Sequence, residues 1–271
     1  MIISLVNNKG GVLKTTIATN VSSVISMSEA KPKVVILDLD GQGNVAVTFG
    51  QHPERLENTA IDVFRGLKTV DDCLLRISDN FDVLPCNFEL GFVDIDVAVA
   101  GELKKQKKFL SQELYTAGDI KRVILSLNKK YDYVILDTPP TMATIVSICL
   151  DVSDLVIIPF EPDHYSVVGL MRIINTIADF KRRNRSLKGL VVPTKVNTRI
   201  KLHNDVIKLI TQKINNIRDV RMSNSFISLT TKPASAVGYE RVPIVMSSVK
   251  SKYRDEYSKL AAEIINELKK T

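Results

Sequence analysis

Short apolar runs recur along this chain and alternate with longer stretches in which apolar residues follow helical spacing. The runs predict strands at Ile2–Val6, Val34–Leu37, Phe81–Leu84, Tyr133–Leu136, Leu155–Ile158 and Leu190–Val192. The longer stretches predict helices at Thr15–Ser28, Ile120–Lys129, Val167–Lys181, His203–Ile214 and Lys252–Lys269. Strands without polar alternation are typical of a sheet that is covered on both faces. The pattern therefore predicts an α/β fold, a doubly wound, mostly parallel sheet with right-handed crossovers.

The segment from Gly50 to Gln112 is the least regular part of the chain. It contains a helix-like stretch, Leu56–Gly66, a short strand, and a basic cluster that reads Lys104-Lys105-Gln106-Lys107-Lys108. Gly and Pro are dispersed and form no linker. We therefore expect a surface excursion on a single domain that spans residues 1–271, and the sequence assigns this excursion no role.

A glycine-containing loop joins the first predicted strand to the first predicted helix, and it reads Asn8-Lys9-Gly10-Gly11-Val12-Leu13-Lys14-Thr15-Thr16. Backbone N–H groups and the helix dipole favour an anion at such a place. Lys14 is placed to neutralise the β- and γ-phosphates of a nucleotide, and the Thr15 hydroxyl to coordinate Mg²⁺. The spelling G-x-x-x-x-G-K-[ST] does not fit, because Asn8 and Leu13 stand at its glycine positions. The variant K-G-G-x-x-K-[ST] does fit, and it places Lys9 at the mouth of the loop.

Two later motifs put carboxylates at strand ends. Asp38 and Asp40 follow the strand Val34–Leu37 and share a face. Asp40 is a candidate for orienting a water, and Asp38 for supporting the metal shell or the phosphate loop. Asp137 ends the strand Tyr133–Leu136 in the Walker B pattern and would hold Mg²⁺ through water. Pro139-Pro140 then fixes a loop beside the γ-phosphate. Taken alone, the glycine loop could be a turn with two solvated lysines, and the Asp38–Asp40 segment could be an acidic turn at a strand end. Three motifs in this order favour a nucleotide site.

These motifs resemble those of the ParA branch of the ParA/MinD ATPases, which carry a deviant Walker A motif. Lys9–Thr16 is similar to the family's KGGVGKTT, Asp38–Asn44 to its DLDPQGN, and Leu136–Pro140 to its Walker B. The late segment Lys195–Leu202 and the terminal region are also similar, so the resemblance covers nearly the whole chain. Two departures are Leu13 in place of a Gly and Gly41 in place of a Pro.

The resemblance implies an ATPase that uses ATP and Mg²⁺ and closes as an ATP-sandwiched homodimer, with slow hydrolysis. It implies that Lys9 crosses to the facing subunit, that Asp40 positions the hydrolytic water, and that Asp137 supports the metal. Asn197 and Pro243 are expected near the base. The nucleotide-binding residues that it implies are Lys9, Gly10, Gly11, Val12, Leu13, Lys14, Thr15 and Thr16.

Small members of this family, of the Soj-like type without an N-terminal helix-turn-helix, partition plasmid or chromosomal DNA. The resemblance implies an ATP-bound dimer that binds DNA without reading its sequence, and a ParB-like centromere-binding partner that stimulates hydrolysis. Candidate DNA contacts are Lys232, Arg241, Lys250, Lys252 and Arg254. An earlier basic run, Lys181 to Arg185, is a weaker candidate, and any one of these residues could be an ordinary solvated side chain.

Composition leaves further alternatives. The chain has 271 residues and a net charge of +7, which permits contact with nucleic acid or an anionic membrane without demonstrating either. A MinD-like regulator would need an amphipathic tail that binds membranes, but Tyr253–Lys270 lacks a terminal Phe or Trp and carries Glu263 and Glu267, so we expect a helix packed on the sheet. A positioning ATPase for protein cargo also fits.

Other features bear on redox chemistry and location. Cys73, Cys86 and Cys149 lack paired spacing, which argues against an iron–sulfur relative and favours buried small side chains. No run has the length of a membrane span and no signal-like segment leads the chain, so we expect a cytoplasmic, nucleoid-associated protein. No helix-turn-helix fits before the loop at Asn8, so operator binding is not expected.

Overall fold

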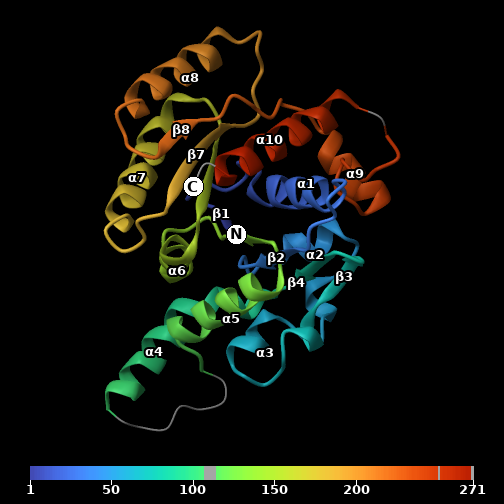
Figure 1. Cartoon of the computed structure of the whole chain (residues 1–271), viewed down its shortest axis with the longest axis vertical. Coiled ribbons are helices and arrows are strands. Elements are labelled where there is room, and N and C mark those ends of the chain that lie inside the picture. The colour runs from blue at the N-terminus through green and yellow to red at the C-terminus, as the bar shows by residue number, and fades with distance from the viewer. Residues whose placement is uncertain (107–113, 250, 270–271) are drawn as a thin grey trace.

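The computed structural model describes residues 1–106, 114–249 and 251–269. Its centre is an eight-stranded sheet with the strand order β3-β4-β2-β5-β1-β6-β7-β8. The strands are β1 (Ile2–Leu5), β2 (Val34–Asp38), β3 (Leu75–Ser78), β4 (Phe81–Leu84), β5 (Tyr133–Asp137), β6 (Leu155–Phe160), β7 (Lys188–Pro193) and β8 (Val220–Met222). Neighbouring strands run parallel except β3 and β4, which are antiparallel. The predicted mostly parallel α/β sheet is confirmed, with helices on both of its faces (Figure 1).

The helices that the sequence predicted are all present, within about three residues at each end. They are α1 (Lys14–Ser26), α5 (Ala117–Lys130), α7 (His164–Phe180), α8 (Lys201–Ile214) and α10 (Lys252–Lys269). The helix-like stretch Leu56–Gly66 contains the shorter helix α3 (Ala60–Phe64). The structure adds α2 (Asn44–Thr48), α4 (Val93–Lys105), α6 (Thr144–Val152) and α9 (Lys232–Glu240). Short 3₁₀ turns lie at η1 (Pro53–Arg55), η2 (Asp71–Cys73) and η3 (Phe88–Phe92).

Alternate residues of the central strands build separate cores on the two faces of the sheet. Val34 and Ile36 pack with α1 and α10 on one face, whereas Val35 and Leu37 pack with α3 and α5 on the other. A third cluster joins β6 and β7 to α7 and α8. Because helices cover both faces of the sheet, both faces of these strands are apolar, and their sequences do not alternate between apolar and polar residues. The unbroken apolar runs predicted this arrangement.

Helix α10 packs along α1, as Figure 1 shows. The apolar stripe that the sequence predicted is buried throughout: Tyr257, Leu260, Ala261, Ile264 and Leu268. This confirms the prediction that the terminal helix packs on the sheet. Within the described parts of the chain, no helix has the length and apolar character needed to cross a bilayer.

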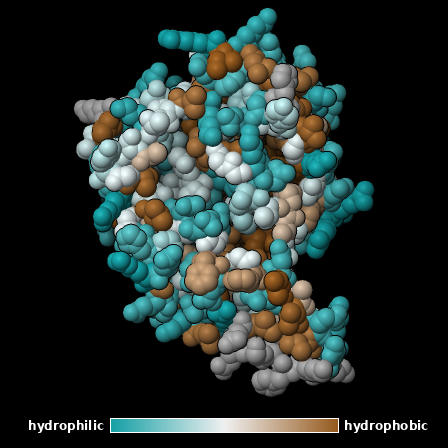
Figure 2. Space-filling model, turned by 180° about the vertical axis from the view of Figure 1, so that it is seen from behind, coloured by the Kyte–Doolittle hydropathy of each residue, from teal (hydrophilic) through white to brown (hydrophobic). Residues whose placement is uncertain are grey.

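Residues 50–106, the described part of the segment from Gly50 to Gln112, form one edge of the sheet with β3 and β4 and lie against the loop that follows β2. Strand β4 pairs with β2, and η3 approaches Gly41 so closely that a Cβ there would lie 3.1 Å from the backbone N of Gly91. Helix α4 and η3 expose Phe88, Phe92, Ile95 and Val99, and Figure 2 shows apolar side chains gathered over α4. Of the predicted basic cluster, Lys104 and Lys105 end α4, and Lys107 and Lys108 lie outside the described residues.

Replacing Leu260 with Ala is expected to lower the free energy of unfolding by about 2–5 kcal/mol, because the loss of a fully buried leucine leaves a cavity between α10 and α1. Urea unfolding followed by circular dichroism measures the change. Lys259→Ala, on the exposed side of the same helix, is the matched control and should shift this free energy by less than about 0.5 kcal/mol. Equal effects of the two substitutions would contradict the packing of α10.

Candidate nucleotide site

The loop between β1 and α1 contains two residues in the left-handed conformation. Gly11 has φ of 74° and takes it without strain, whereas Leu13, which precedes α1, has φ of 71°. The left-handed conformation costs a residue with a side chain about 1–2 kcal/mol. The Leu13 side chain packs against the core beside α1, which offsets part of this cost. The loop thus keeps its turn although a leucine stands where the resembling family has a glycine.

Lys14 is buried at the base of this loop. Its Nζ donates to the carbonyl oxygen of Asn7 at 3.0 Å and reaches that of Lys9 at 3.4 Å. Burial lowers the pKa of Lys14, and the charges of Asp137 and Asp40 oppose that shift. Asn7 is itself fixed, since its Nδ2 donates to the carbonyl oxygen of Pro159 at 2.7 Å. Among the described residues, the hydrogen-bond acceptors of this ammonium group are uncharged carbonyl oxygens, which suits it to an incoming anion.

Asp137 and Thr15 meet beneath the loop. The Thr15 hydroxyl donates to Asp137 Oδ2 at 2.6 Å, and the buried Oδ1 of Asp137 has no hydrogen-bond partner among the described residues. Burial raises the pKa of Asp137 to about 7. An unpartnered buried carboxylate oxygen beside a hydroxyl is a donor set of the kind that Mg²⁺ prefers. The residues present therefore fit the metal that the sequence predicted here.

Asp38 lies beside Asp137, because the two residues are paired in register on β2 and β5. Its carboxylate accepts the backbone N–H groups of Asp40 at 3.0 Å and Val45 at 3.2 Å. Full burial raises the pKa of Asp38 well above its usual range, and the charge of Asp137 adds to that shift. The two carboxylates thus form a buried pair whose charges repel each other. Asp38 also fixes the turn that carries Asp40.

A cavity of about 450 Å³ opens above these groups. Its lining residues are Gly10, Gly11, Leu13, Lys14, Thr15, Thr16, Asp40, Gln42, Asn44, Val47, Thr48, Pro140 and Val237. The structure therefore brings the glycine loop, the Asp40 loop and the proline loop to one place. Asp38 and Asp137 lie buried beneath, as does Val12.

The residues expected near the base are not part of the cavity wall. The Asn197 side chain accepts the backbone N–H of Arg199 at 3.1 Å, and Pro243 is buried in the turn before α10.

Lys9 points to two acidic residues across the mouth of the loop. Its Nζ lies 2.7 Å from Asp163 Oδ2 and 3.7 Å from Glu161 Oε2. The hydrogen bond to Asp163 raises the pKa of Lys9. Partial burial would raise the pKa of Asp163, but hydrogen bonds from Lys9 and from Ser166 hold it below its usual value. Glu161 and Asp163 were not predicted from the sequence, although they follow the apolar run Leu155–Ile158. They satisfy the same strand-end rule as Asp38 and Asp137.

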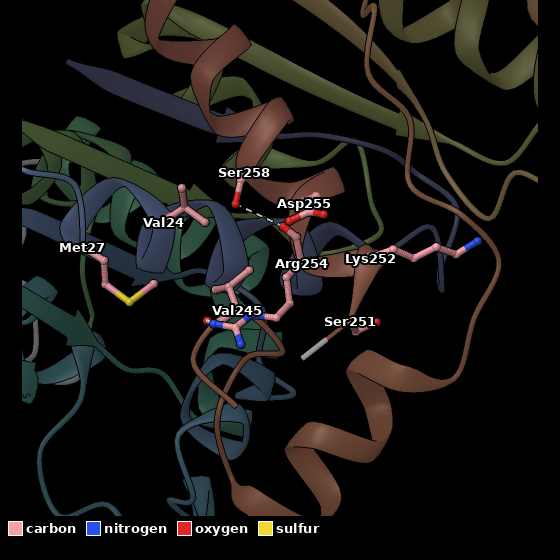
Figure 3. A pocket seen from close by; sticks show the side chains of 8 residues that line it. All are labelled: Val24, Met27, Val245, Ser251, Lys252, Arg254, Asp255 and Ser258. Carbon is pink, nitrogen blue, oxygen red and sulfur yellow. Dashed lines mark hydrogen bonds between the residues drawn. The ribbon is translucent and has the colours of Figure 1, made fainter. Parts of the chain in front are cut away.

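The predicted DNA contacts differ in how they are held. Lys232 and Arg241 are exposed at the two ends of α9, and Lys250 lies outside the described residues. Arg254 donates to the carbonyl oxygens of Val245 at 2.6 Å and Ser247 at 3.3 Å. Figure 3 shows Arg254 turned toward Val245 and Lys252 pointing away. Arg254 therefore shapes the turn before α10, whereas Lys252 is presented outward.

The fold and the loop together define a P-loop NTPase. The family model described as an AAA domain matches residues 1–189. A protein of Mycoplasma pneumoniae named "ParA family protein" is 51% identical over 277 residues, which cover 98% of this chain and 97% of that protein. This chain belongs to the ParA family.

Two solved structures share the fold. Cobyrinic acid a,c-diamide synthase from Mycobacterium smegmatis, with a bound ATP analogue and magnesium, matches with a TM-score of 0.77 and 23% identity, covering 98% of this chain and 94% of that one. A plasmid partition protein from Borrelia burgdorferi bound to AMPPNP matches with a TM-score of 0.72 and 19% identity, covering 98% of both chains. At such identities the likeness shows the fold alone.

The substitution Asp38→Asn is expected to favour the folded, nucleotide-free protein by about 1–3 kcal/mol more at pH 8 than at pH 5, because it removes one charge from a buried pair. The folded state binds more protons than the unfolded state between the usual carboxyl value of 3.8 and the raised value of about 7 for Asp137. The stability of the wild type should therefore fall as pH rises through this window. Urea unfolding at pH 5 and pH 8 measures the difference between Asp38→Asn and the wild type, and the loss of one backbone N–H acceptor contributes equally at both values. A difference of the same size at pH 5 and pH 8 would contradict the raised pKa values of this pair.

Proposed function

We propose that this chain is a Mg²⁺-dependent ATPase that partitions DNA. The observation that carries the proposal is the hydrogen bond between Thr15 and Asp137, with the unpartnered Asp137 Oδ1, beneath a loop that holds Lys14. An NTP-binding loop needs backbone donors, a cation and a metal-binding hydroxyl at this spacing. The solved fold relatives that carry an ATP analogue with magnesium or AMPPNP support ATP as the nucleotide.

Each residue of the site has a role in this proposal. The backbone of residues 9–16 cradles the phosphates, and Lys14 exchanges its carbonyl partners for phosphate oxygens. Thr15 and Asp137 would hold Mg²⁺ with support from Asp38, and the metal supplies neutralisation of phosphate charge. Asp40, whose Oδ1 accepts the Gln42 N–H at 3.1 Å, orients the attacking water. Asn197 and Pro243 lie near the base.

The ATP-bound state is a homodimer in this proposal. Lys9 leaves Asp163 and crosses to the nucleotide of the facing subunit. Dimerisation doubles the basic surface around α9 and the start of α10, so that weak phosphate contacts act together. The contacts are Lys232, Arg241, Lys250, Lys252 and Arg254, with Arg254 acting mainly through the turn that it holds.

The proposed cycle takes place on the nucleoid in the cytoplasm, with residues 1–271 as one domain. A ParB-like protein bound at a centromere site stimulates slow hydrolysis and releases the dimer from DNA. The relative from Borrelia burgdorferi described as a plasmid partition protein supports DNA as the cargo.

Random-sequence duplex DNA is expected to bind this protein with MgATP and to bind at least about tenfold more weakly with MgADP or without nucleotide. Fluorescence anisotropy measures the affinity. Rising salt should weaken binding steeply, because phosphate contacts release counterions. Lys9→Ala and Lys14→Ala should each abolish the MgATP-dependent gain, the first through the dimer and the second through the nucleotide.

Lys121→Ala, on α5, is the control for loss of one surface charge and should bind DNA like the wild type. Protein that binds ATP and dimerises but binds no DNA in any nucleotide state would contradict DNA as the cargo. Membrane vesicles or a protein cargo would then replace DNA in the assay.

A further inference from the structure

Four charged side chains form a cluster at the mouth of the glycine loop. Lys9 pairs with Asp163 and Glu161, and Lys195 pairs with Glu161, with its Nζ 3.5 Å from Glu161 Oε2. The cluster holds two cations and two anions and is therefore neutral. The resemblance of this chain to its family gives Lys9 a role, and Lys195 has none so far.

The backbone conformation of Lys195 is unusual. Lys195 has φ of 52°, a left-handed conformation that lysine adopts rarely. The neighbouring residues pin it there, since Thr194 N donates to the carbonyl oxygen of Phe160 at 2.8 Å and Val196 N to that of Ile227 at 3.0 Å. The conformation is thus imposed by the end of β6 on one side and by the segment after β8 on the other. A strained position that is held this firmly is a reason to ask what its side chain does.

The ammonium group of Lys195 lies against the glycine loop itself. Its Nζ would be 3.8 Å from a Cβ placed on Gly11, and its side chain is 29% exposed. Lys195 is nevertheless not among the residues that line the cavity of the proposed nucleotide site. Lys195 instead contacts Glu161 and lies close to Gly11 of the loop.

Two carboxylates at the mouth of the loop would lose a cation if Lys9 crossed to the facing subunit. Glu161 and Asp163 are carboxylates beside a site that is to accept a triphosphate, and Lys9 is the cation that faces both of them. If Lys9 crosses to the other subunit, the two carboxylates lose that partner. Like charges brought together at an interface oppose association. Lys195 is the cation that stays behind in contact with Glu161.

We infer that Lys195 is a positioning residue of the ATP-bound dimer, whose ammonium group holds and neutralises Glu161 when Lys9 leaves the cluster. The inference rests on the proposed function, because it presupposes that Lys9 crosses between subunits. Lys195 then favours the dimer without touching the nucleotide of its own subunit. Its removal should weaken the ATP-dependent dimer and leave the binding of ADP by the monomer unchanged.

The test compares Lys195→Asn with Lys195→Arg. Asn tolerates the left-handed conformation and is neutral, so that fold and backbone are preserved, whereas Arg keeps the charge. Analytical ultracentrifugation with Mg²⁺ and a non-hydrolysable ATP analogue gives the dimer dissociation constant, and calorimetry gives the affinity for MgADP. We expect Lys195→Asn to raise the dimer dissociation constant about tenfold, Lys195→Arg to restore it largely, and neither to change MgADP affinity.

Lys121→Asn is the matched control, because Lys121 also faces a carboxylate, Asp151 at 3.8 Å, and lies on α5. It should dimerise like the wild type. A wild-type dissociation constant for Lys195→Asn, an equal loss with Lys121→Asn, no rescue by Arg, or a parallel loss of MgADP affinity would each overturn the inference. Failure of the wild type to dimerise with the ATP analogue would instead overturn the proposed function, and this inference with it.

Discussion

The hydrogen bond between Thr15 and Asp137 is the contact on which the site depends. It joins the first turn of α1 to the end of β5, across 122 residues of sequence. The bond forms because β5 lies between β1 and β2 with Leu5 and Asp38 in register with Asp137. The parallel order of these strands brings the glycine loop and both carboxylates to one edge of the sheet, as parallel sheets do with ligand sites. In the nucleotide-free state, the buried Oδ1 of Asp137 lacks a hydrogen bond among the described residues, which costs folding free energy. A bound cation would remove that cost.

Two of the three loops that border the cavity are held by residues 50–106, the described part of the segment between Gly50 and Gln112. The loop after β2 lies under η3 at Gly41, where no side chain would fit without a shift. The loop after β5 leads into α6, whose first N–H, that of Thr144, donates to Asp94 of α4 at 3.1 Å. A change in the conformation of either loop would therefore alter its contacts with η3 or α4. Residues 50–106, to which the sequence assigned no role, are thus placed beside both loops.

Several features of the fold followed from pattern alone. Strand runs without alternation placed β1, β2 and β4 to β7, and strand-end carboxylates placed Asp38 and Asp137 next to the loop. Helix α6 was missed because Thr144–Val152 is short and mostly apolar, although its polar residues Thr144, Ser147 and Asp151 follow helical spacing. Strand β3 was missed because Leu75–Ser78 is a short, half-exposed edge strand. The contact of Lys9 with Asp163 spans 154 residues and depends on which strands are neighbours, which local patterns do not contain.

The magnesium site at Asp137 is tested most directly by calorimetric titration of ATP into the wild type and Asp137→Asn, with Mg²⁺ and with excess EDTA. We expect wild-type affinity for ATP to fall at least about tenfold when Mg²⁺ is removed, because the Asp137 oxygen and the Thr15 hydroxyl serve the metal. We also expect the ATP affinity of Asp137→Asn, although this variant is folded, to respond little to Mg²⁺. Equal ATP affinity with and without Mg²⁺ in the wild type, or an undiminished Mg²⁺ response in Asp137→Asn, would contradict a magnesium site at Asp137.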